Sequence, residues 1–372
     1  MIKVIHVISD TNIGGAGRLL LNCLKNFDRN EFSIKVVLPK DSKLKPEIES
    51  LSCKTIEIDG NKDKSFDRST IGELTKLFKT EKPDIVHTHA SMSGRIAAFL
   101  AGVKIRLYTR HCAFEPRKIL TLFPLKQING IIDDILTYRV IATAEVAKND
   151  IIRTGIRKKK IKVILNGVTP LSRYSETEIN SVKERLNITP DKFVVGIIAR
   201  LEECKGQAAF IEAINQLNDK DVIGIIVGDG SCRQKYIDKV LELKLQDNII
   251  FTGFQNDVTP FINILDVNVN CSNLSETTCL ALSEGMSLRK PSIATDCGGN
   301  SDMVHNGRNG FLIPINDVLS LANSIKILKD DRELYKKMSD SAREIYQAKF
   351  TAEFMVKEIE KLYKACVEER IK

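Results

Sequence analysis

The 372-residue sequence lacks any apolar run long enough to cross a membrane, which takes about 20 residues in a helix. Its start, Met-Ile-Lys-Val-Ile-His-Val-Ile-Ser, has neither the cationic stretch nor the small-residue cleavage site of a signal peptide. We therefore expect a cytoplasmic protein, in which any membrane association is peripheral and at the cytoplasmic face.

Cysteine pairs of the kind that bind metals or form disulfides are also missing. The nine cysteines are odd in number and scattered, without a Cys-x-x-Cys motif. This usage is typical of reduced thiols in a cytoplasmic protein. We assign no Asp-x-Asp motif to metal binding, so the sequence predicts no metal site.

Acidic residues are scarce in the first half of the chain. Residues 1–168 hold 30 Lys and Arg against 18 Asp and Glu, a formal charge of +12, whereas residues 169–372 hold 26 against 30, a charge of −4. A basic half suggests an anionic partner, such as a membrane surface or a lipid-linked phosphate. No recognised nucleic-acid-binding motif accompanies the charge, so we expect no nucleic-acid partner.

Short β-rich runs alternate with helical patterns from the first residue, and a second such series begins near residue 193. This alternation is typical of doubly wound parallel sheets. The sequence therefore predicts an α/β protein with two Rossmann-like domains that face a central cleft. The expected strands are Lys3–Ile8, Ser33–Leu38, Lys54–Ile58, Asp84–His87, Lys104–Thr109, Val140–Ala142, Lys162–Leu165, Phe193–Ile198, Val222–Val227, Asn248–Phe251, Val267–Asn270 and Ser292–Thr295.

Residues 271–286 are the most informative stretch. Ser275 is a candidate N-cap for a helix over Thr278–Ser287. Glu276 and Glu284 would then be roughly 12 Å apart along the axis, at about 1.5 Å per residue. The acid and base of a glycoside hydrolase need about 5 to 9.5 Å, so this spacing suits two ends of one elongated ligand. The N–H groups at the mouth of the helix predict an anion site that takes phosphate.

Two further segments follow this Glu-x7-Glu pattern: Lys-Pro-Ser-Ile-Ala-Thr-Asp-Cys-Gly-Gly and Asn-Gly-Arg-Asn-Gly-Phe-Leu-Ile-Pro. In this order they resemble the donor half of family 4 glycosyltransferases (glycosyl transferases group 1), retaining enzymes of the GT-B fold that use nucleotide sugars. The resemblance implies an acceptor-binding domain over 1–168 and a donor-binding domain over 169–351. It also implies that a last helix, about 352–372, packs back on the first domain.

The same resemblance implies the donor contacts. Arg200 and Lys205 match the cations that grip the diphosphate, whose leaving charge they stabilise best where water is excluded. Glu276 matches the residue that contacts hydroxyls of the transferred sugar, and Glu284 the one that holds the ribose. Many family members have an aromatic residue and a glycine after the first glutamate, so residues 277–279 depart from the pattern and leave the shape of the sugar pocket open. The expected donor site comprises Gly14, Gly15, Arg200, Lys205, Gly253, Phe254, Glu276, Thr277, Thr278, Cys279, Leu280 and Glu284.

Gly14-Gly15-Ala16-Gly17 follows the first expected strand. The dinucleotide fingerprint fails here, because its third glycine position is Leu20. A tight turn before a helix is one interpretation. The resemblance implies the other, in which Gly14 and Gly15 let the backbone approach the donor's diphosphate closely.

Histidines end two expected strands of the first half, at the edge where doubly wound sheets bind ligands. We expect His87 to bond a neighbour, and His89 and Arg110 to lie on the acceptor side. His111 resembles the family's histidine that approaches the sugar and the attacking acceptor. A core role for His111 and a solvated surface charge for Arg110 are the alternatives.

Residues 114–136 combine Arg117, Lys118 and Lys126 with many apolar residues. Such a segment suits a lipid interface. It equally suits a core-facing helix whose lysine stems lie along apolar surface. The basic run Arg157–Lys160 fits a membrane patch less well than a solvated turn.

Together, these features predict a retaining, metal-independent glycosyltransferase of the hexosyltransferase type that needs no cofactor. We expect a UDP-sugar as donor and a glycan or lipid-linked acceptor in cell-surface polysaccharide synthesis, with peripheral contact to an anionic membrane. The expected catalytic residues are His111, Arg200, Lys205 and Glu276. Two alternatives stay open: a nucleotide-sugar epimerase on a related fold, and a non-catalytic subunit that binds a nucleotide sugar.

Overall fold

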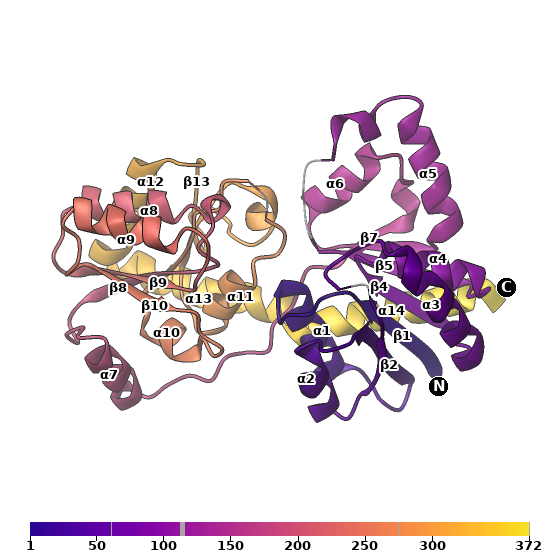
Figure 1. The fold of residues 1–372 in the computed structure, drawn as a ribbon. Coiled ribbons are helices and arrows are strands. Elements are labelled where there is room, and N and C mark those ends of the chain that lie inside the picture. The colour runs from indigo at the N-terminus through magenta and orange to yellow at the C-terminus, as the bar shows by residue number, and fades with distance from the viewer. Residues whose placement is uncertain (61, 112–115, 275, 372) are drawn as a thin grey trace. The chain divides into compact units, whose positions relative to one another are not determined.

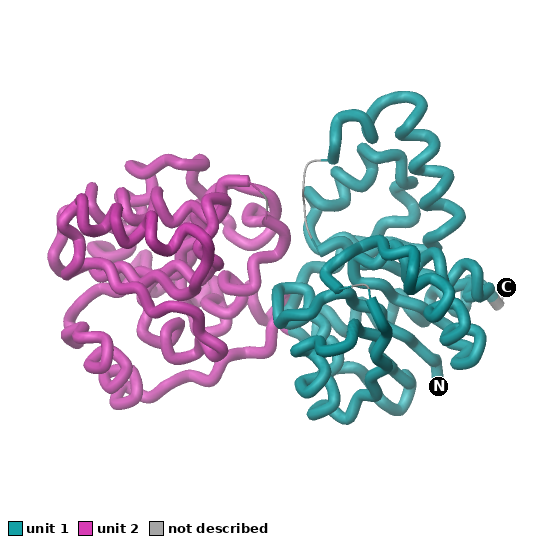
Figure 2. Tube along the Cα trace, viewed as in Figure 1, with its two compact units in different colours: residues 1–167, 352–372 teal, residues 168–351 magenta. Residues whose placement is uncertain are grey.

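The computed structural model describes residues 1–60, 62–111, 116–274 and 276–371, and the chain divides into two compact units. Unit 1 comprises residues 1–167 and 352–372, and unit 2 comprises residues 168–351 (Figure 2). This division lies within one residue of the one expected from the sequence. Each unit has its own parallel sheet and its own apolar core, which confirms the α/β prediction.

Unit 1 contains a seven-stranded parallel sheet in the order β3-β2-β1-β4-β5-β6-β7 (Figure 1). Its strands are β1 (Ile2–Ile8), β2 (Phe32–Pro39), β3 (Lys54–Ile58), β4 (Ile85–His89), β5 (Ile105–Arg110), β6 (Arg139–Ala142) and β7 (Ile161–Val163). Because β1 pairs with both β2 and β4, the strand order reverses there. In doubly wound sheets, ligands bind at the carboxyl ends of the strands beside such a reversal.

The helices of unit 1 cover both faces of this sheet. They are α1 (Gly15–Asn26), α2 (Leu44–Ser50), α3 (Arg68–Glu81), α4 (Met92–Leu100), η1 (Lys118–Thr121), α5 (Leu125–Leu136), α6 (Glu145–Arg153), η2 (Lys158–Lys160) and α14 (Ala352–Ile371). Helices α1, α2 and α14 share a buried cluster with Val4 and Ile8 of β1, whereas α3 and α4 share another with Ile5 and Val7. The C-terminal helix α14 is therefore part of the core of unit 1.

Unit 2 contains a six-stranded parallel sheet in the order β10-β9-β8-β11-β12-β13. Its strands are β8 (Phe193–Ile198), β9 (Val222–Val227), β10 (Ile249–Gly253), β11 (Val267–Asn270), β12 (Ser292–Thr295) and β13 (Gly310–Ile313). Its helices are α7 (Glu176–Arg185), η3 (Glu203–Lys205), α8 (Gln207–Leu217), α9 (Arg233–Glu242), α10 (Thr259–Ile264), α11 (Leu280–Ser287), η4 (Gly298–Asp302), α12 (Val318–Asp330) and α13 (Arg332–Lys349). Here the strand order reverses between β8 and β11.

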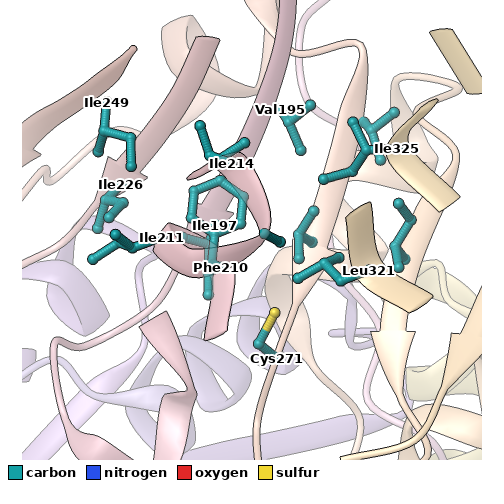
Figure 3. Packing of buried hydrophobic residues seen from close by; sticks show 14 of the residues in the cluster. Val195, Ile197, Phe210, Ile211, Ile214, Ile226, Ile249, Cys271, Leu321 and Ile325 are labelled. Carbon is teal, nitrogen blue, oxygen red and sulfur yellow. The ribbon is translucent and has the colours of Figure 1, made fainter. Parts of the chain in front are cut away.

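Phe210 of α8 lies at the centre of the larger core of unit 2 (Figure 3). Its ring is fully buried in one cluster with Ile197 of β8, Ile214 of α8 and Ile226 of β9. Cys271, the residue after β11, belongs to the same cluster and is buried. The loop that leaves β11 therefore starts from a close-packed point.

Two expectations about the elements were wrong. Strand β13 is not among the expected strands, and α11 begins at Leu280 rather than Thr278, with Cys279 as its N-cap residue. The expected cap, Ser275, lies outside the described residues. Among the residues that the structure describes, no helix combines the length and the apolar character needed to span a bilayer.

Candidate functional site

The strand reversal of unit 2 brings two predicted donor residues together. Lys205 ends η3, in the loop after β8, and Glu276 lies in the loop after β11. Because β8 and β11 are neighbours, both loops leave the same edge of the sheet. The Lys205 ammonium forms an ion pair with the Glu276 carboxylate, which also accepts a hydrogen bond of 2.6 Å from the Ser272 hydroxyl.

This pair is mostly shielded from water. The side chain of Lys205 is 20% exposed and that of Glu276 is 11% exposed. Burial alone would lower the pKa of Lys205, but the Glu276 carboxylate outweighs it, so the pKa of Lys205 is raised. A lysine that stays charged in a partly dry site is suited to hold the phosphates of a ligand.

Glycines let the two loops approach each other. Gly206, next to Lys205, has a φ of +71°, and a Cβ there would lie 2.0 Å from the carbonyl oxygen of Cys271. The Asn273 N–H donates to the Cys204 carbonyl at 3.0 Å and ties the loops further. On the other side, the Gly299 N–H donates to the Glu276 carbonyl at 3.0 Å. Lys205 and Glu276 are thus held by backbone contacts.

The start of α11 differs from the expected row of unused N–H groups. The Cys279 N–H donates to the sulfur of Met303 at 3.2 Å, and its thiol accepts from the Asn270 amide at 3.1 Å. Burial raises the pKa of the Cys279 thiol to about 11, so the group stays neutral. Thr277 and Thr278 are buried, and Leu280 is the first residue of the helix.

The two predicted glutamates belong to different elements. Glu284 is half-buried on α11, whereas Glu276 precedes that helix. The separation of roughly 12 Å assumed one continuous axis at about 1.5 Å per residue, so it does not apply to this arrangement. Both carboxylates do lie between β11 and β12, Glu276 in the loop after β11 and Glu284 on α11.

Other predicted donor residues lie at strand ends of unit 2. Arg200 is exposed two residues after β8, and its carbonyl accepts a hydrogen bond of 2.8 Å from the Gln207 amide. Gly253 ends β10 with a φ of +71°, and no heavy atom lies within 4 Å of the position of a Cβ. Phe254 beside it is 63% exposed. This end of β10 therefore offers open backbone and an aromatic ring to a ligand.

The glycine-rich loop of unit 1 is open in the same way. Gly14 is the N-cap residue of α1, and a Cβ at Gly14 or Gly15 would meet no heavy atom within 4 Å. Gly17 is different, because a Cβ there would lie 2.7 Å from a methyl group of Leu44 on α2. Gly17 therefore serves helix packing, and only the first two glycines leave room for a ligand.

Four of the five histidines form one cluster in unit 1: His6, His87, His89 and His111. His87 forms hydrogen bonds with the Tyr363 hydroxyl at 2.6 Å and the Thr109 hydroxyl at 2.7 Å, which agrees with the expectation that it bonds a neighbour. His111 is half-buried after β5, next to the half-buried Arg110. Sequence reasoning missed His6, which is opposite His87 in the β1–β4 register.

The expectation that His89 contacts the acceptor does not fit this cluster. His89 is 3% exposed, its Nε2 lies 2.9 Å from Nδ1 of His6, and its Nδ1 lies 2.9 Å from Nε2 of His111. Both ring nitrogens are therefore occupied by other histidines. His89 lies behind His111 as a supporting residue.

Burial keeps all four rings neutral. It lowers the pKa of His6 to about 3 and that of His111 to about 4. Burial, reinforced by the neighbouring histidines, also lowers the pKa of His87 and His89 well below the usual value. At neutral pH each ring therefore has one N–H donor and one acceptor nitrogen.

Metal binding has weak support among the described residues. One ring nitrogen each from His6, His87 and His89 lies within 4.8 Å of the others, which makes a candidate metal cluster. Both nitrogens of His87 are already bonded to hydroxyl groups, so a metal would have to displace them. The triplet Asp219-Lys220-Asp221 has the Asp-x-Asp form, but its carboxylates pair with Lys329 and Lys192.

Helix α5 is the described helix within residues 114–136, for which the sequence left two interpretations open. Its inward face holds Asp133, whose carboxylate pairs with Arg95 of α4 at 3.1 Å. Its outward face is a stripe of four isoleucines that are 46–60% exposed, and Phe123 before it is 82% exposed. The isoleucine stripe therefore does not face the core, whereas Gly130, Asp133 and Leu136 on the other face are buried. The isoleucines of this stripe are Ile128, Ile131, Ile132 and Ile135.

Two family models match the chain. The model described as Glycosyltransferase Family 4 matches residues 13–170, in unit 1 and the first residues of unit 2. The model described as Glycosyl transferases group 1 matches residues 178–345, within unit 2. The second match contains Lys205, Glu276 and Glu284.

Similar proteins and structures span nearly the same length. The UDP-Gal:alpha-D-GlcNAc-diphosphoundecaprenol alpha-1,3-galactosyltransferase of Escherichia coli is 29% identical over 353 residues, 90% of this chain and 89% of that protein. The capsular polysaccharide biosynthesis glycosyltransferase CapM of Staphylococcus aureus is 26% identical over 317 residues, 82% of each chain. The crystal structure of Anabaena HepE in complex with UDP-glucose matches with a TM-score of 0.84 and 23% identity, over 98% of this chain and 100% of that chain.

Proposed function

Because the chain belongs to family 4 of the glycosyltransferases and has the GT-B fold, we propose that it moves a sugar from a UDP-sugar to a lipid-linked acceptor. We propose further that transfer retains the configuration of the sugar, needs no metal ion and serves cell-surface polysaccharide synthesis. The HepE complex with UDP-glucose supports the donor class. The E. coli relative, whose name includes a diphosphoundecaprenol acceptor, supports the acceptor class.

The observation that carries this proposal is the Lys205–Glu276 pair at the strand reversal of unit 2. As the bond to the donor sugar breaks, negative charge develops on the diphosphate. A fixed ammonium in a site of reduced water access stabilises that charge more than it stabilises the bound donor. Lys205 and Arg200 supply this charge stabilisation without a metal ion in the proposed mechanism.

The other side chains complete the proposed site. Glu276 accepts hydrogen bonds from hydroxyls of the transferred sugar, and Glu284 accepts them from the ribose. The backbone at Gly253 and the ring of Phe254 meet the base, and Gly14 and Gly15 approach the diphosphate. The acceptor hydroxyl attacks the face that the diphosphate leaves and gives its proton to the leaving phosphate, so the sugar retains its configuration.

The donor assignment is tested by thermal stabilisation with UDP-, GDP-, ADP- and dTDP-sugars. We expect a rise in Tm with UDP-sugars that disappears in Glu284→Ala. The matched control is Glu242→Ala, an exposed glutamate at the end of α9, which should keep the shift. If none of these nucleotide sugars raised the Tm, the proposal would be refuted. Conversion of donor without acceptor would indicate the epimerase, and binding without turnover the non-catalytic subunit.

Stereochemistry and metal use need a turnover assay. Proton NMR of the product of an α-linked UDP-sugar should show an α-linkage, and an excess of EDTA should leave the rate unchanged. A β-linked product would disprove retention. Loss of activity with EDTA that added Mg²⁺ restores would disprove metal independence.

We also propose that α5 contacts an anionic membrane surface. A helix with four isoleucines outward, whose Asp133 is buried and whose Asp134 is paired with Arg157 and Lys160, can bury that stripe in the interfacial region of a bilayer. The exposed Lys118 and Arg117 precede the helix and favour anionic lipids. This contact would bring the acceptor-binding unit to a lipid-linked substrate.

The membrane contact is tested with vesicles of phosphatidylglycerol and phosphatidylcholine. The double substitution Ile131→Asn with Ile135→Asn should weaken binding to anionic vesicles by tenfold or more, since each buried isoleucine contributes about 1.5 kcal/mol or more. The control is Leu319→Asn with Ile327→Asn, which removes two exposed apolar side chains from α12. Equal binding by wild type and the α5 variant would refute this part of the proposal.

A further inference from the structure

The histidine cluster of unit 1 is a continuous chain of hydrogen bonds. Starting from the Thr109 hydroxyl, it runs through both nitrogens of His87 to the hydroxyl of Tyr363 on α14. From that hydroxyl it passes through both nitrogens of His6 and both nitrogens of His89 to Nε2 of His111. The contacts along this chain are 2.7, 2.6, 3.4, 2.9 and 2.9 Å long.

With the Tyr363 hydroxyl donating one hydrogen bond within the chain and accepting the other, the chain can be ordered in only two ways. A neutral imidazole has one N–H donor and one acceptor nitrogen, so each ring that donates at one nitrogen must accept at the other. The position of the proton on one ring therefore fixes the position on the next. Reversing a single ring would place two donors or two acceptors in contact, and an unmade hydrogen bond of a buried group costs about 1–3 kcal/mol.

Tyr363 selects the direction. Its hydroxyl lies 2.6 Å from Nδ1 of His87 but 3.4 Å from Nε2 of His6. Hydroxyl donors make shorter bonds than N–H donors, so the short contact is the one in which the phenol donates to His87. The tyrosine oxygen then accepts from Nε2–H of His6, whose Nδ1 accepts from Nε2–H of His89. His89 Nδ1 in turn accepts from His111.

We propose that this chain fixes the tautomer of His111, with the proton on Nε2 and the lone pair on Nδ1, and that Tyr363 and His89 are positioning residues. The consequence for catalysis depends on the proposed function, in which His111 approaches the sugar and the acceptor. There, a fixed lone pair at Nδ1 can only accept a hydrogen bond from a hydroxyl. The other tautomer would offer a donor at that atom.

Ring packing alone does not explain the arrangement. The rings of His6 and His89, and those of His89 and His111, have centroids 5.2 Å apart and planes 19° and 15° from parallel, and with facing nitrogens 2.9 Å apart they lie edge to edge. Phenylalanine rings could also lie side by side. Phenylalanine, however, has no ring nitrogens, whereas His6, His87 and His89 are buried and each uses both of its ring nitrogens in hydrogen bonds.

The first test is the tautomer of each ring in the full-length protein without ligand. Long-range ¹H–¹⁵N correlation spectra of ¹⁵N-histidine-labelled protein at pH 7 distinguish protonated from unprotonated ring nitrogens, and the five histidines can be assigned by single substitutions. We expect the Nε2–H form for His111, His89, His6 and His87. A fixed Nδ1–H form of His111, or a mixture of tautomers, would overturn the inference. A bound metal with shifts typical of ligated rings would overturn it too.

The second test removes the phenol. In Tyr363→Phe the ring shape remains, and we expect His111 to show a mixture of tautomers and kcat to fall about tenfold with the donor KM unchanged. Tyr346→Phe is the control, because that buried tyrosine donates at 2.8 Å to the Val168 carbonyl and not to a histidine. A Tyr363→Phe protein with the wild-type tautomer and kcat would overturn the inference.

A further comparison separates this inference from the proposed function. Fixed tautomers in a protein that transfers no sugar would support the chain of hydrogen bonds and refute only the transferase role. Normal transfer by a wild-type protein whose His111 has no fixed tautomer would support the transferase role and refute the inference about the tautomer.

Discussion

At the scale of single residues, the Lys205–Glu276 pair links the fold to the chemistry. Without a ligand, the ammonium is neutralised by a carboxylate that the Ser272 hydroxyl also binds. A bound diphosphate would compete with Glu276 for the same ammonium. The two residues should therefore have opposite effects on nucleotide binding, although both are expected to be needed for transfer.

We predict that Lys205→Ala weakens UDP binding and lowers kcat by about 10²–10³-fold, because it removes a charge that stabilises the leaving group. Glu276→Gln should bind UDP at least as tightly as wild type, since it removes a competing anion, but should lose turnover. Calorimetric titration with UDP and with uridine measures the binding of each variant, and the turnover assay measures its kcat. If Lys205→Ala weakened uridine binding as much as UDP binding, its contact would not be with the phosphates.

Gly206 should be intolerant of any side chain. Its φ of +71° already disfavours alanine, and a Cβ would lie 2.0 Å from the backbone oxygen of Cys271. Gly206→Ala should therefore lower both Tm and kcat, because the loop that holds Lys205 must move. Gly307→Ala is the matched control, with a φ of +76° and no heavy atom within 4 Å of the position of its Cβ. The control should lose about 1 kcal/mol of stability and keep its kcat.

At the scale of elements, the sequence predicted the strands well and their surroundings less well. Five of the six strands of unit 2 follow from short β-rich runs, but β13 has four residues and starts at a glycine, so its pattern is too weak to identify. The start of α11 depends on Cys279, which is not a usual cap residue. The apolar and basic residues of the segment that contains α5 fit two interpretations, because the sequence does not tell which face of the helix is buried.

In helix α5, replacing a charged residue should destabilise the protein more than replacing an isoleucine, because the charged Asp133 is buried and the isoleucines are exposed. Its Asp133 is 5% exposed and Arg95 is 13% exposed, so removing the charge of Asp133 leaves a buried guanidinium without an anion. Asp133→Asn should destabilise the protein by about 3 kcal/mol. Ile132→Ser, on the outward face, should change stability by less than about 0.5 kcal/mol. Urea unfolding measures both, and a larger loss for Ile132→Ser would show that the stripe is buried.

At the scale of the whole molecule, the histidine cluster could not be read from the sequence. Its four histidines and Tyr363 come from distant parts of the chain. They meet only because β1, β4 and β5 are adjacent and α14 packs on the same face as Ile8. Sequence patterns predict which segments form strands. They do not predict which rings on neighbouring strands and a distant helix meet, because that depends on register and packing across the core.

The cluster also predicts how unit 1 responds to acid. Burial lowers the pKa of His6 to about 3 and that of His111 to about 4, whereas an unfolded histidine has a pKa of about 6.5. The unfolded chain therefore binds more protons below pH 6.5, and stability falls as the pH falls, by about 1.4 kcal/mol per pH unit for each such histidine.

Calorimetric scans between pH 7 and 5 should show this loss of stability in one transition. The only histidine of unit 2 is the half-buried His305, so the transition of unit 2 should shift less than that of unit 1. His6→Asn should flatten the acid dependence of the sensitive transition because one fewer buried ring titrates on unfolding, and His305→Asn should leave that dependence unchanged. Equal shifts of both transitions in wild type, or an unchanged slope in His6→Asn, would mean that the cluster does not control the acid stability of unit 1.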